Sequence, residues 1–199
     1  MSATASPSPV QKGLDGVVAA ETKLGDVDGA RCQLIYRGYP IDELAGRATY
    51  EEVAFLLLRG HLPTKPELAE WTEQLAHRRA LDPQVIQAMQ MLPAGDPMAY
   101  LRTVVSIIGL ADPKAEGANA NTMTEEALDL ISKTPTIVAL CDRMRRKKPM
   151  LGPKPELSHA ANFLYMLHGE LPSPQQTEAL DAYFVLLAEH GLNASTFVA

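Results

Sequence analysis

His190 is the residue whose type and position best suit chemistry in this chain of 199 residues. It closes a segment of helical spacing and is followed by Gly191, so a chain reversal can project its imidazole into a cleft. One ring nitrogen can donate a hydrogen bond to a carbonyl or carboxylate while a partner fixes the other. A helix C-terminus also favours the protonated ring, which helps to hold an anion. These properties would suit a substrate contact.

Composition alone favours a plainer role for His190, as a helix cap or as a buried histidine with satisfied hydrogen bonds. A serine hydrolase is a poor interpretation, because Ser195 lies in no Gly-x-Ser-x-Gly turn and has only His190 as a nearby base. The glycines are too scattered for a phosphate-binding loop.

The other histidines and the cysteines lack the spacing of metal ligands or redox motifs. We expect surface or capping roles for four histidines: His61, His77, His159 and His168. Cys32 and Cys141 are too few and too far apart for a disulfide framework or a four-cysteine metal site. We expect both to be reduced, buried thiols.

A cluster of cations follows a predicted helix: Arg143, Arg145, Arg146, Lys147 and Lys148. A phosphate-bearing ligand could bind it, but cations in the last turn of a helix complement the helix dipole without any ligand. We therefore interpret the cluster as a solvated face. Arg37 and Arg102 are capable of bidentate carboxylate binding, but a single arginine is more often an ion-pair partner, so neither is assigned to a site.

Composition and charge limit the class of protein. The length and the hydrophobic fraction of 46% fit one sizeable domain with a real core. The net charge of −6 argues against a general nucleic-acid binder. The first nine residues resemble neither a secretory signal nor an organelle transit peptide, and no apolar run reaches the roughly 20 residues of a membrane helix. We expect a soluble cytoplasmic protein with a loose N-terminal tail.

The beginning of the chain predicts a small β-hairpin. Glycine, β-branched and aromatic residues are frequent from 17 to 39, and Asp28-Gly29 reads as a turn between strands at 17–23 and 31–36. Beyond Pro40 the spacing of apolar residues is helical.

Capping signals predict where the helices start. Thr49 with Glu52, Thr64 with Glu67, and the two Asp-Pro pairs at 82–83 and 96–97 are typical helix N-termini. Helices are expected at 83–91, 97–110, 124–148, 156–168 and 174–190. Pro135 should kink or split the longest one. The three-proline stretch at 149–155 is either a mobile surface loop or a rigid helix connection.

One block of sequence occurs twice. Residues 55–64, Phe-Leu-Leu-Leu-Arg-Gly-His-Leu-Pro-Thr, return at 164–173 as Leu-Tyr-Met-Leu-His-Gly-Glu-Leu-Pro-Ser. Each copy ends one helix at glycine and starts the next at a hydroxyl cap, with Gln176 in the place of Glu67. Two copies are too few for a solenoid. We expect two equivalent helix-to-helix corners in one bundle.

Residues 186–197, Leu-Leu-Ala-Glu-His-Gly-Leu-Asn-Ala-Ser-Thr-Phe, resemble the stretch around the first oxaloacetate-contacting histidine of bacterial-type citrate synthases and the similar 2-methylcitrate synthases. Other segments resemble the same family in the same order. They are Gly13-Leu-Asp-Gly-Val-Val-Ala-Ala-Glu-Thr22, Tyr36-Arg-Gly-Tyr-Pro-Ile41, Glu52-Val-Ala-Phe-Leu-Leu57, Gly60-His-Leu-Pro-Thr64, Pro97-Met98 with Leu101-Arg102-Thr103, Ala160-Ala-Asn-Phe-Leu-Tyr-Met-Leu167 and Gly169-Glu-Leu-Pro-Ser173. Asp96 stands where bacterial members often have histidine, and we read it as a helix cap.

The resemblance implies a mainly α fold: the multi-helix large domain of the citrate synthase fold with a small N-terminal β-hairpin. Residues 13–199 would form the N-terminal part of that domain after a disordered tail at 1–12. The remaining large-domain helices and the small domain would be absent from this chain. The resemblance also implies a homodimer, with a hexamer as the larger alternative.

The implied reaction is a Claisen condensation. An aspartate takes a proton from acetyl-CoA, a histidine stabilises the enol, the enol attacks the oxaloacetate carbonyl, and hydrolysis then gives citrate and CoA. In the family those two groups, a further substrate histidine and the carboxylate-binding arginines lie C-terminal to this segment. Only His190 therefore carries over, as an oxaloacetate contact, with Asn193 as a much weaker candidate for a contact at the same place. The chain alone is expected to be inactive. Acetyl-CoA is a substrate, and no cofactor or metal is expected.

Two alternatives stay open. A 2-methylcitrate synthase would use propionyl-CoA with the same oxaloacetate site, and these residues do not separate the two activities. A non-catalytic helical interaction module is the alternative from another class.

Overall fold

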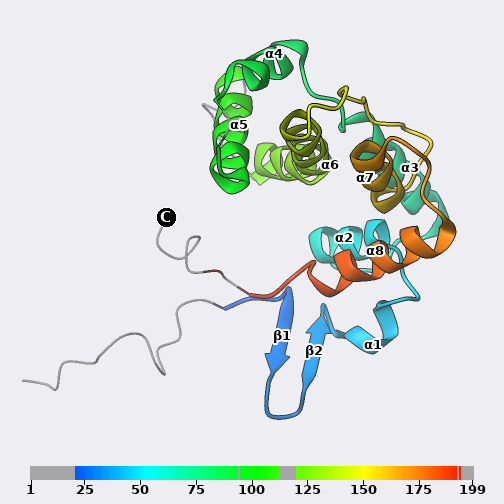
Figure 1. Cartoon of the computed structure of the whole chain (residues 1–199). Helices are drawn as coiled ribbons and strands as arrows, with labels where there is room; N and C mark the ends of the chain where they lie inside the picture. Colours follow the sequence, from blue (N-terminus) through cyan, green and yellow to red (C-terminus); the bar gives the residue numbers. More distant parts are fainter. Residues whose placement is uncertain (1–20, 94, 113–119, 192, 194–199) are drawn as a thin grey trace, which may run out of the picture.

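The computed structural model describes residues 21–93, 95–112, 120–191 and 193, with the backbone alone at 120–122. These residues form a mainly helical body with a small antiparallel sheet at one end (Figure 1). The predicted fold class is confirmed. The tail predicted at 1–12 lies outside the described residues.

The sheet begins with β1 (Gly25–Asp28) and β2 (Gln33–Tyr36), paired so that Asp28 lies opposite Gln33. The strand predicted at 17–23 is wrong in position: part of it lies outside the described residues, and residues 21–23 are not in the sheet. The reason is local. The Asp28 carboxylate accepts a hydrogen bond from the Arg31 backbone N–H at 3.0 Å, which places the reversal after Asp28 and the strand directly before it.

A third strand, β3 (Tyr39–Pro40), extends the predicted hairpin. It follows β2 through a two-residue turn in which Arg37 has φ 49° and Gly38 has φ 91°. Two positive φ values in succession match the right-handed twist of the strands that such a turn joins. The short helix α1 (Ile41–Leu44) comes directly after it.

Two helix pairs form the repeated corners: α2 (Tyr50–Arg59) with α3 (Lys65–His77), and α7 (His159–His168) with α8 (Pro174–Leu186). Gly60 ends α2 at φ 90°, and Gly169 ends α7 at φ 92°, conformations that favour glycine. The Gly60 N–H donates to Leu56 O and the Gly169 N–H to Tyr165 O, each at 2.8 Å. The predicted equivalence of the corners is confirmed.

The second helix of each corner starts at a reciprocal cap. The Thr64 N–H donates to the Glu67 carboxylate at 2.8 Å, and the Ser173 N–H donates to Gln176 Oε1 at the same distance. The predicted cap of α2 is also present, because the Thr49 N–H donates to the carboxylate three residues ahead at 2.7 Å. A side-chain acceptor thus satisfies a backbone donor that the helix leaves open.

Aspartate caps start α4 (Pro83–Met91) and α5 (Pro97–Ala111), close to the predicted spans. Asp82 accepts from the Gln84 N–H at 2.7 Å, and Asp96 accepts from the Met98 N–H at 2.9 Å. Proline fits the next position because its missing N–H would have no partner there.

The long helix α6 (Ala120–Arg145) starts four residues earlier and ends three residues earlier than predicted. It runs through Pro135 without interruption, so of the predicted kink or split the split is wrong. Packing outweighs the local cost of the proline: α6 contributes Leu128, Ile137 and Leu140, each at most 3% exposed, to the core.

The proline-rich connection between α6 and α7 is tied down. The Arg79 guanidinium donates to Lys154 O at 3.1 Å and to Leu157 O at 2.7 Å, and the Lys154 N–H donates to Asn162 Oδ1 at 2.7 Å. Of the two interpretations, these contacts favour the rigid connection. The helix after it starts at His159 rather than at 156, because Ser158 caps it by accepting from the Ala161 N–H.

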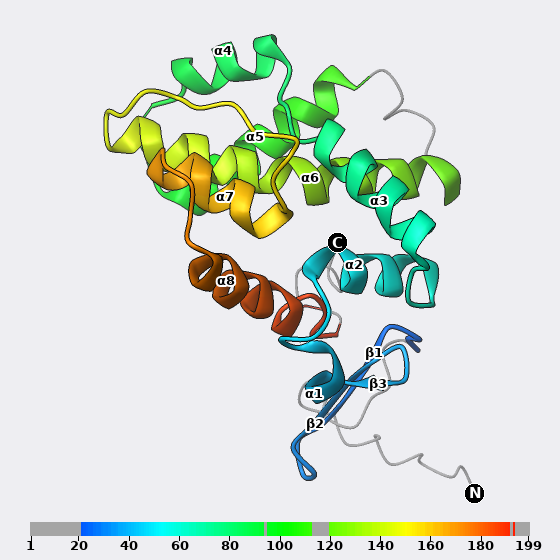
Figure 2. The same cartoon turned by 90° about the vertical axis from the view of Figure 1, so that its right-hand side faces the viewer.

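The helices pack in layers. Figure 2 shows α2 and α8 between the sheet with α1 on one side and α3, α6 and α7 on the other. One buried cluster contains side chains of α4, α5, α6 and α7, among them Met89, Val104, Ile137, Leu140 and Met166. A second joins the sheet to α1, α2 and α8 and includes Tyr36, Leu44, Val53, Leu56 and Val185. The second cluster therefore connects the sheet to the end of α8.

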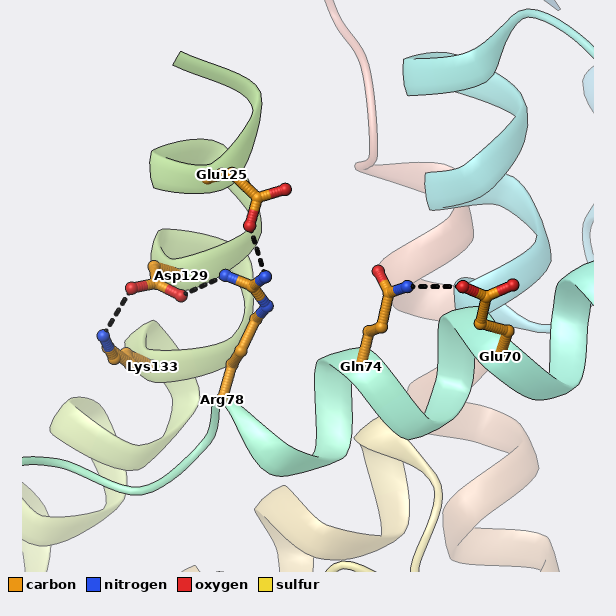
Figure 3. A network of polar contacts seen from close by, with 6 residues as sticks. All are labelled: Glu70, Gln74, Arg78, Glu125, Asp129 and Lys133. Atoms are coloured by element: carbon orange, nitrogen blue, oxygen red, sulfur yellow. Dashed lines mark hydrogen bonds and ion pairs between the residues drawn. The ribbon is translucent and has the colours of Figure 1, made fainter. Parts of the chain in front are cut away.

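A polar network fastens α3 to α6 (Figure 3). Arg78, just after α3, pairs with Glu125 and with Asp129, the latter at 2.8 Å, and Lys133 pairs with the other Asp129 oxygen at 2.7 Å. Burial alone would raise the pKa of Asp129, but the hydrogen bonds from Lys133 and Arg78 outweigh it, and the pKa is lowered. The network fixes where α3 ends against the long helix.

Candidate functional site

His190 lies four residues beyond α8 rather than at its end. The predicted span of 174–190 is wrong at this end because the last turn tightens. The Leu187 N–H is shared between Tyr183 O at 3.2 Å and Phe184 O at 3.3 Å, which ends the regular ladder. The His190 side chain is exposed. The favourable field of the helix dipole falls off within the last turn, so the imidazole lies beyond its range.

The turn after α8 is fastened to the sheet by Tyr36, the last residue of β2, which is 0% exposed. Its hydroxyl oxygen lies 3.0 Å from Leu186 O, 2.9 Å from Glu189 O and 3.2 Å from the Glu189 N. The single hydroxyl proton serves one carbonyl at a time, while a lone pair accepts from the N–H. Burial raises the pKa of Tyr36, so the phenol keeps the proton that it donates.

Glu189 extends this hold past His190. Its Oε1 accepts from the Gly191 N–H at 2.7 Å, and Gly191 has φ 80°. The backbone is therefore fixed on both sides of His190 while the imidazole stays exposed. Asn193, the weaker candidate, is also exposed. Residues 192 and 194–199, with Ser195 among them, lie outside the described residues.

Three of the other histidines are exposed, as predicted: His61, His77 and His168. His159 contradicts the prediction, because it is only 4% exposed. Its ring lies against Tyr50 and Phe184, with centroids 4.8 and 5.9 Å away. Its backbone N–H donates to the Glu51 carboxylate at 2.8 Å. Burial, with a smaller effect of the Arg79 charge, lowers the pKa of His159 to about 4, so the ring is neutral at pH 7.

Sequence reasoning missed this buried polar group, which also includes Glu51 at 3% and Arg79 at 1% exposed. A signal for Glu51 was available: it lies one helical turn before Phe55, on the apolar side of α2. Asp181 of α8 lies nearby and accepts from the Tyr50 N–H at 3.1 Å. Burial raises the pKa of Asp181 to about 6. The group joins α2, α7 and α8 and leaves His190 outside it.

The cation cluster divides into two kinds of residue. Four members are exposed, as expected of a solvated face: Arg145, Arg146, Lys147 and Lys148. For Arg143 that interpretation is wrong, because it is 5% exposed. Its guanidinium donates to Pro149 O, to Met166 O at 3.3 Å and to Leu167 O at 3.2 Å. Arg143 therefore ties the end of α7 to the start of the proline-rich connection.

Arg37 and Arg102, which were not assigned to a site, have different surroundings. The Arg37 guanidinium donates to Leu57 O at 2.8 and 3.2 Å and so holds the end of α2. Arg102 is exposed on α5. Of the two thiols predicted to be buried, Cys141 is buried, but Cys32 is exposed because it closes the β1–β2 turn at φ 53°.

A separate pocket of about 370 Å³ lies between α5, α6 and α7. Its wall is apolar at Met98, Leu101 and Phe163, and Arg145 and His168 supply polar groups. His190 does not line it. Among the described residues, no three histidines, cysteines or carboxylates gather as a metal site would require. The described helices also include none that combines the length and the apolar character of a membrane span.

Known proteins match nearly the whole chain. A family model described as citrate synthase, C-terminal domain, matches residues 13–199. The chain belongs to the citrate synthase family. A citrate synthase of Haloferax volcanii is 44% identical over 195 residues, which cover 96% of this chain and 52% of that protein. A 2-methylcitrate synthase of Mycobacterium tuberculosis is 41% identical over 191 residues, covering 96% and 48%.

The fold agrees with that family. The crystal structure of citrate synthase from Pyrobaculum aerophilum matches with a TM-score of 0.86 at 35% identity, over 98% of this chain and 54% of that one. The chain thus spans about half the length of the curated relatives it matches. The family includes both citrate synthases and 2-methylcitrate synthases, so membership does not choose between the two activities.

Proposed function

We propose that this chain is part of a citrate synthase, an acyltransferase that condenses acetyl-CoA with oxaloacetate to give citrate and CoA, and that His190 contacts oxaloacetate. The observation that carries the proposal is the exposed imidazole of His190 between two fixed backbone positions. It occurs in a chain that matches the family over residues 13–199.

The role proposed for His190 follows from the charge that develops in the reaction. When the enol of acetyl-CoA attacks the ketone of oxaloacetate, the carbonyl oxygen gains negative charge. A hydrogen bond from the imidazole to that oxygen strengthens as the charge grows and so favours the transition state. A fixed backbone on both sides of the residue reduces the orientational entropy that the contact would otherwise cost.

Substitution of His190 tests the assignment in the complete polypeptide. In His190→Ala the KM for oxaloacetate should rise by roughly tenfold or more, the effect of a lost hydrogen bond to a charged substrate, and kcat should also fall, because that bond strengthens in the transition state. The KM for acetyl-CoA should change less than about twofold. His168→Ala, which removes another exposed histidine, the last residue of α7, is the control. An unchanged oxaloacetate dependence in His190→Ala would contradict the assignment.

The 199-residue chain alone should form no citrate. The resemblance assigns the proton-abstracting aspartate, the enol-stabilising histidine and the carboxylate-binding arginines to sequence beyond this segment. A coupled assay of CoA release with the purified chain, free of longer species, checks this. Citrate formation at a measurable rate would show that the described segment holds more of the machinery than we propose.

A 2-methylcitrate synthase is the second candidate, favoured by the relative from Mycobacterium tuberculosis. The ratio of kcat/KM for acetyl-CoA and propionyl-CoA in the complete polypeptide decides between them. A cytoplasmic homodimer, or a hexamer, completes the proposal, and light scattering on the complete polypeptide measures the assembly. A monomer without condensation activity would favour the non-catalytic helical module instead.

A further inference from the structure

The end of β2 holds the ends of two helices through two adjacent residues. Tyr36 contacts Leu186 O and Glu189 beyond α8, and Arg37 donates to Leu57 O near the end of α2. The sheet is therefore hydrogen-bonded to the turn that carries His190, although more than 150 residues of sequence separate them.

We propose that Tyr36 is a positioning residue for His190, and that the small N-terminal sheet sets the place of the substrate histidine. This inference rests on the proposed function, because it takes His190 to be the oxaloacetate contact.

The first argument is the rigidity of the anchor. Tyr36 is 0% exposed and packs with Leu44, Val53 and Leu56, so its ring cannot follow a shift of the turn. Val185, also 0% exposed, brings the last turn of α8 into the same cluster. The apolar contacts of Val185 hold the end of α8, and the Tyr36 hydroxyl fixes the backbone at Glu189 after it.

The second argument comes from the other strand. A Cβ on Gly25 of β1 would collide with Glu189 Oε2, so the Glu189 side chain lies close against β1. The other oxygen of that carboxylate accepts the Gly191 N–H at 2.7 Å. One strand thus fixes the backbone just before His190, and the neighbouring strand lies against the carboxylate that holds the backbone just after it.

Tyr36→Phe removes the hydroxyl and keeps the buried ring. Tyr100→Phe is a matched control, because the Tyr100 hydroxyl is also buried and donates to a carbonyl of a helix end, Met89 O, at 2.8 Å. In the complete polypeptide, Tyr36→Phe should raise the KM for oxaloacetate by about five- to tenfold, the value of one to two hydrogen bonds. The KM for acetyl-CoA should stay within about twofold in both variants.

A second pair of variants tests the strand that Tyr36 does not belong to. Gly25→Ala should displace the Glu189 carboxylate and press on Ile35 O, 3.1 Å from the added Cβ, and should raise the KM for oxaloacetate by about two- to fivefold. In Gly29→Ala, in the same hairpin, the added Cβ has no neighbour within 4 Å, so the KM for oxaloacetate should stay unchanged. Equal changes in the KM of both substrates would indicate a merely structural role and overturn the inference.

Amide hydrogen exchange of the complete polypeptide separates this inference from the proposed function. The Glu189 N–H loses its acceptor in Tyr36→Phe, so it should exchange about tenfold faster there than in Tyr100→Phe. Unchanged exchange overturns the positioning role whatever His190→Ala shows. Faster exchange together with an unaffected His190→Ala enzyme supports the anchor and rejects His190 as the oxaloacetate contact.

Discussion

The two helix corners have the same local geometry but different support. In each corner a guanidinium binds the carbonyl three residues before the glycine: Arg37 donates to Leu57 O, and Arg143 donates to Met166 O. Arg37 comes from the sheet, is half-buried and holds one carbonyl. Arg143 comes from α6, is 5% exposed and holds three. The sequence block thus encodes the turn, whereas the surrounding fold supplies the arginine that completes it.

The corners also differ in charge. Glu67 caps α3, and hydrogen bonds from the Thr64 backbone, the Thr64 hydroxyl and His61 lower its pKa to about 2. Gln176 makes the same backbone contact at the second corner without a charge. The first corner therefore responds to acid, and the equivalent contact of the second does not.

The largest effect is expected from Arg143. Arg143→Met keeps much of the buried stem but leaves three carbonyls without their donor, and the unfolding free energy should fall by about 4 kcal/mol. Arg37→Met should cost only about 1–2 kcal/mol, because one carbonyl is affected and the guanidinium that is removed is only half-buried. Urea denaturation of both variants measures the difference. Arg145→Met, at an exposed site two residues on, is the control, and equal losses in Arg143→Met and Arg37→Met would remove the distinction between the corners.

The corner glycines should give a smaller and nearly equal effect. Gly60→Ala and Gly169→Ala each place a Cβ at φ near 90°, which costs about 1–2 kcal/mol in either corner. A Cβ at Gly60 meets nothing within 4 Å, and one at Gly169 makes ordinary contact with the Arg143 guanidinium at 3.4 Å. Thermal or urea unfolding that differed by more than about 1 kcal/mol between the two would show that the turn is not a local unit.

The smallest effect concerns acid. The Glu67 pKa is lowered from 4.5 to about 2, so its contribution to stability is present above pH 4.5 and is lost as the pH falls towards 2. Glu67→Gln should flatten that part of the stability curve, and Gln176→Glu should add a similar slope at the other corner. Urea midpoints measured from pH 5 to pH 2 check both changes. Parallel curves for the wild type and Glu67→Gln would contradict the role of the charge.

Predictions from the sequence were most accurate where a helix start depends on neighbouring residues. Asp82 and Asp96 cap their helices as expected, because cap and helix lie within four residues of sequence. The end of α8 was misplaced: its last turn tightens at Leu187, and Tyr36 binds the backbone there from a strand 150 residues away. The start of β1 was misplaced for a local reason, the Asp28 turn, that competed with the strand pattern.

Burial of polar residues was the least predictable property. His159 and Arg143 carry ordinary surface signals in the sequence, yet they are 4% and 5% exposed. Whether a histidine at a helix start faces Tyr50 and Phe184 or solvent depends on which helices meet there. Charge patterns describe one helix at a time, so they do not contain that information.

The sequence by itself determined the helical class, the caps, the two glycine corners and the family to which the chain belongs. Each depends on residues close together in the chain or on a pattern kept along its length. Only the tertiary structure decided that the small sheet holds the turn around His190 and that Arg143 supports the second corner. Those contacts join distant segments, and their free energy exists only once the segments have packed together.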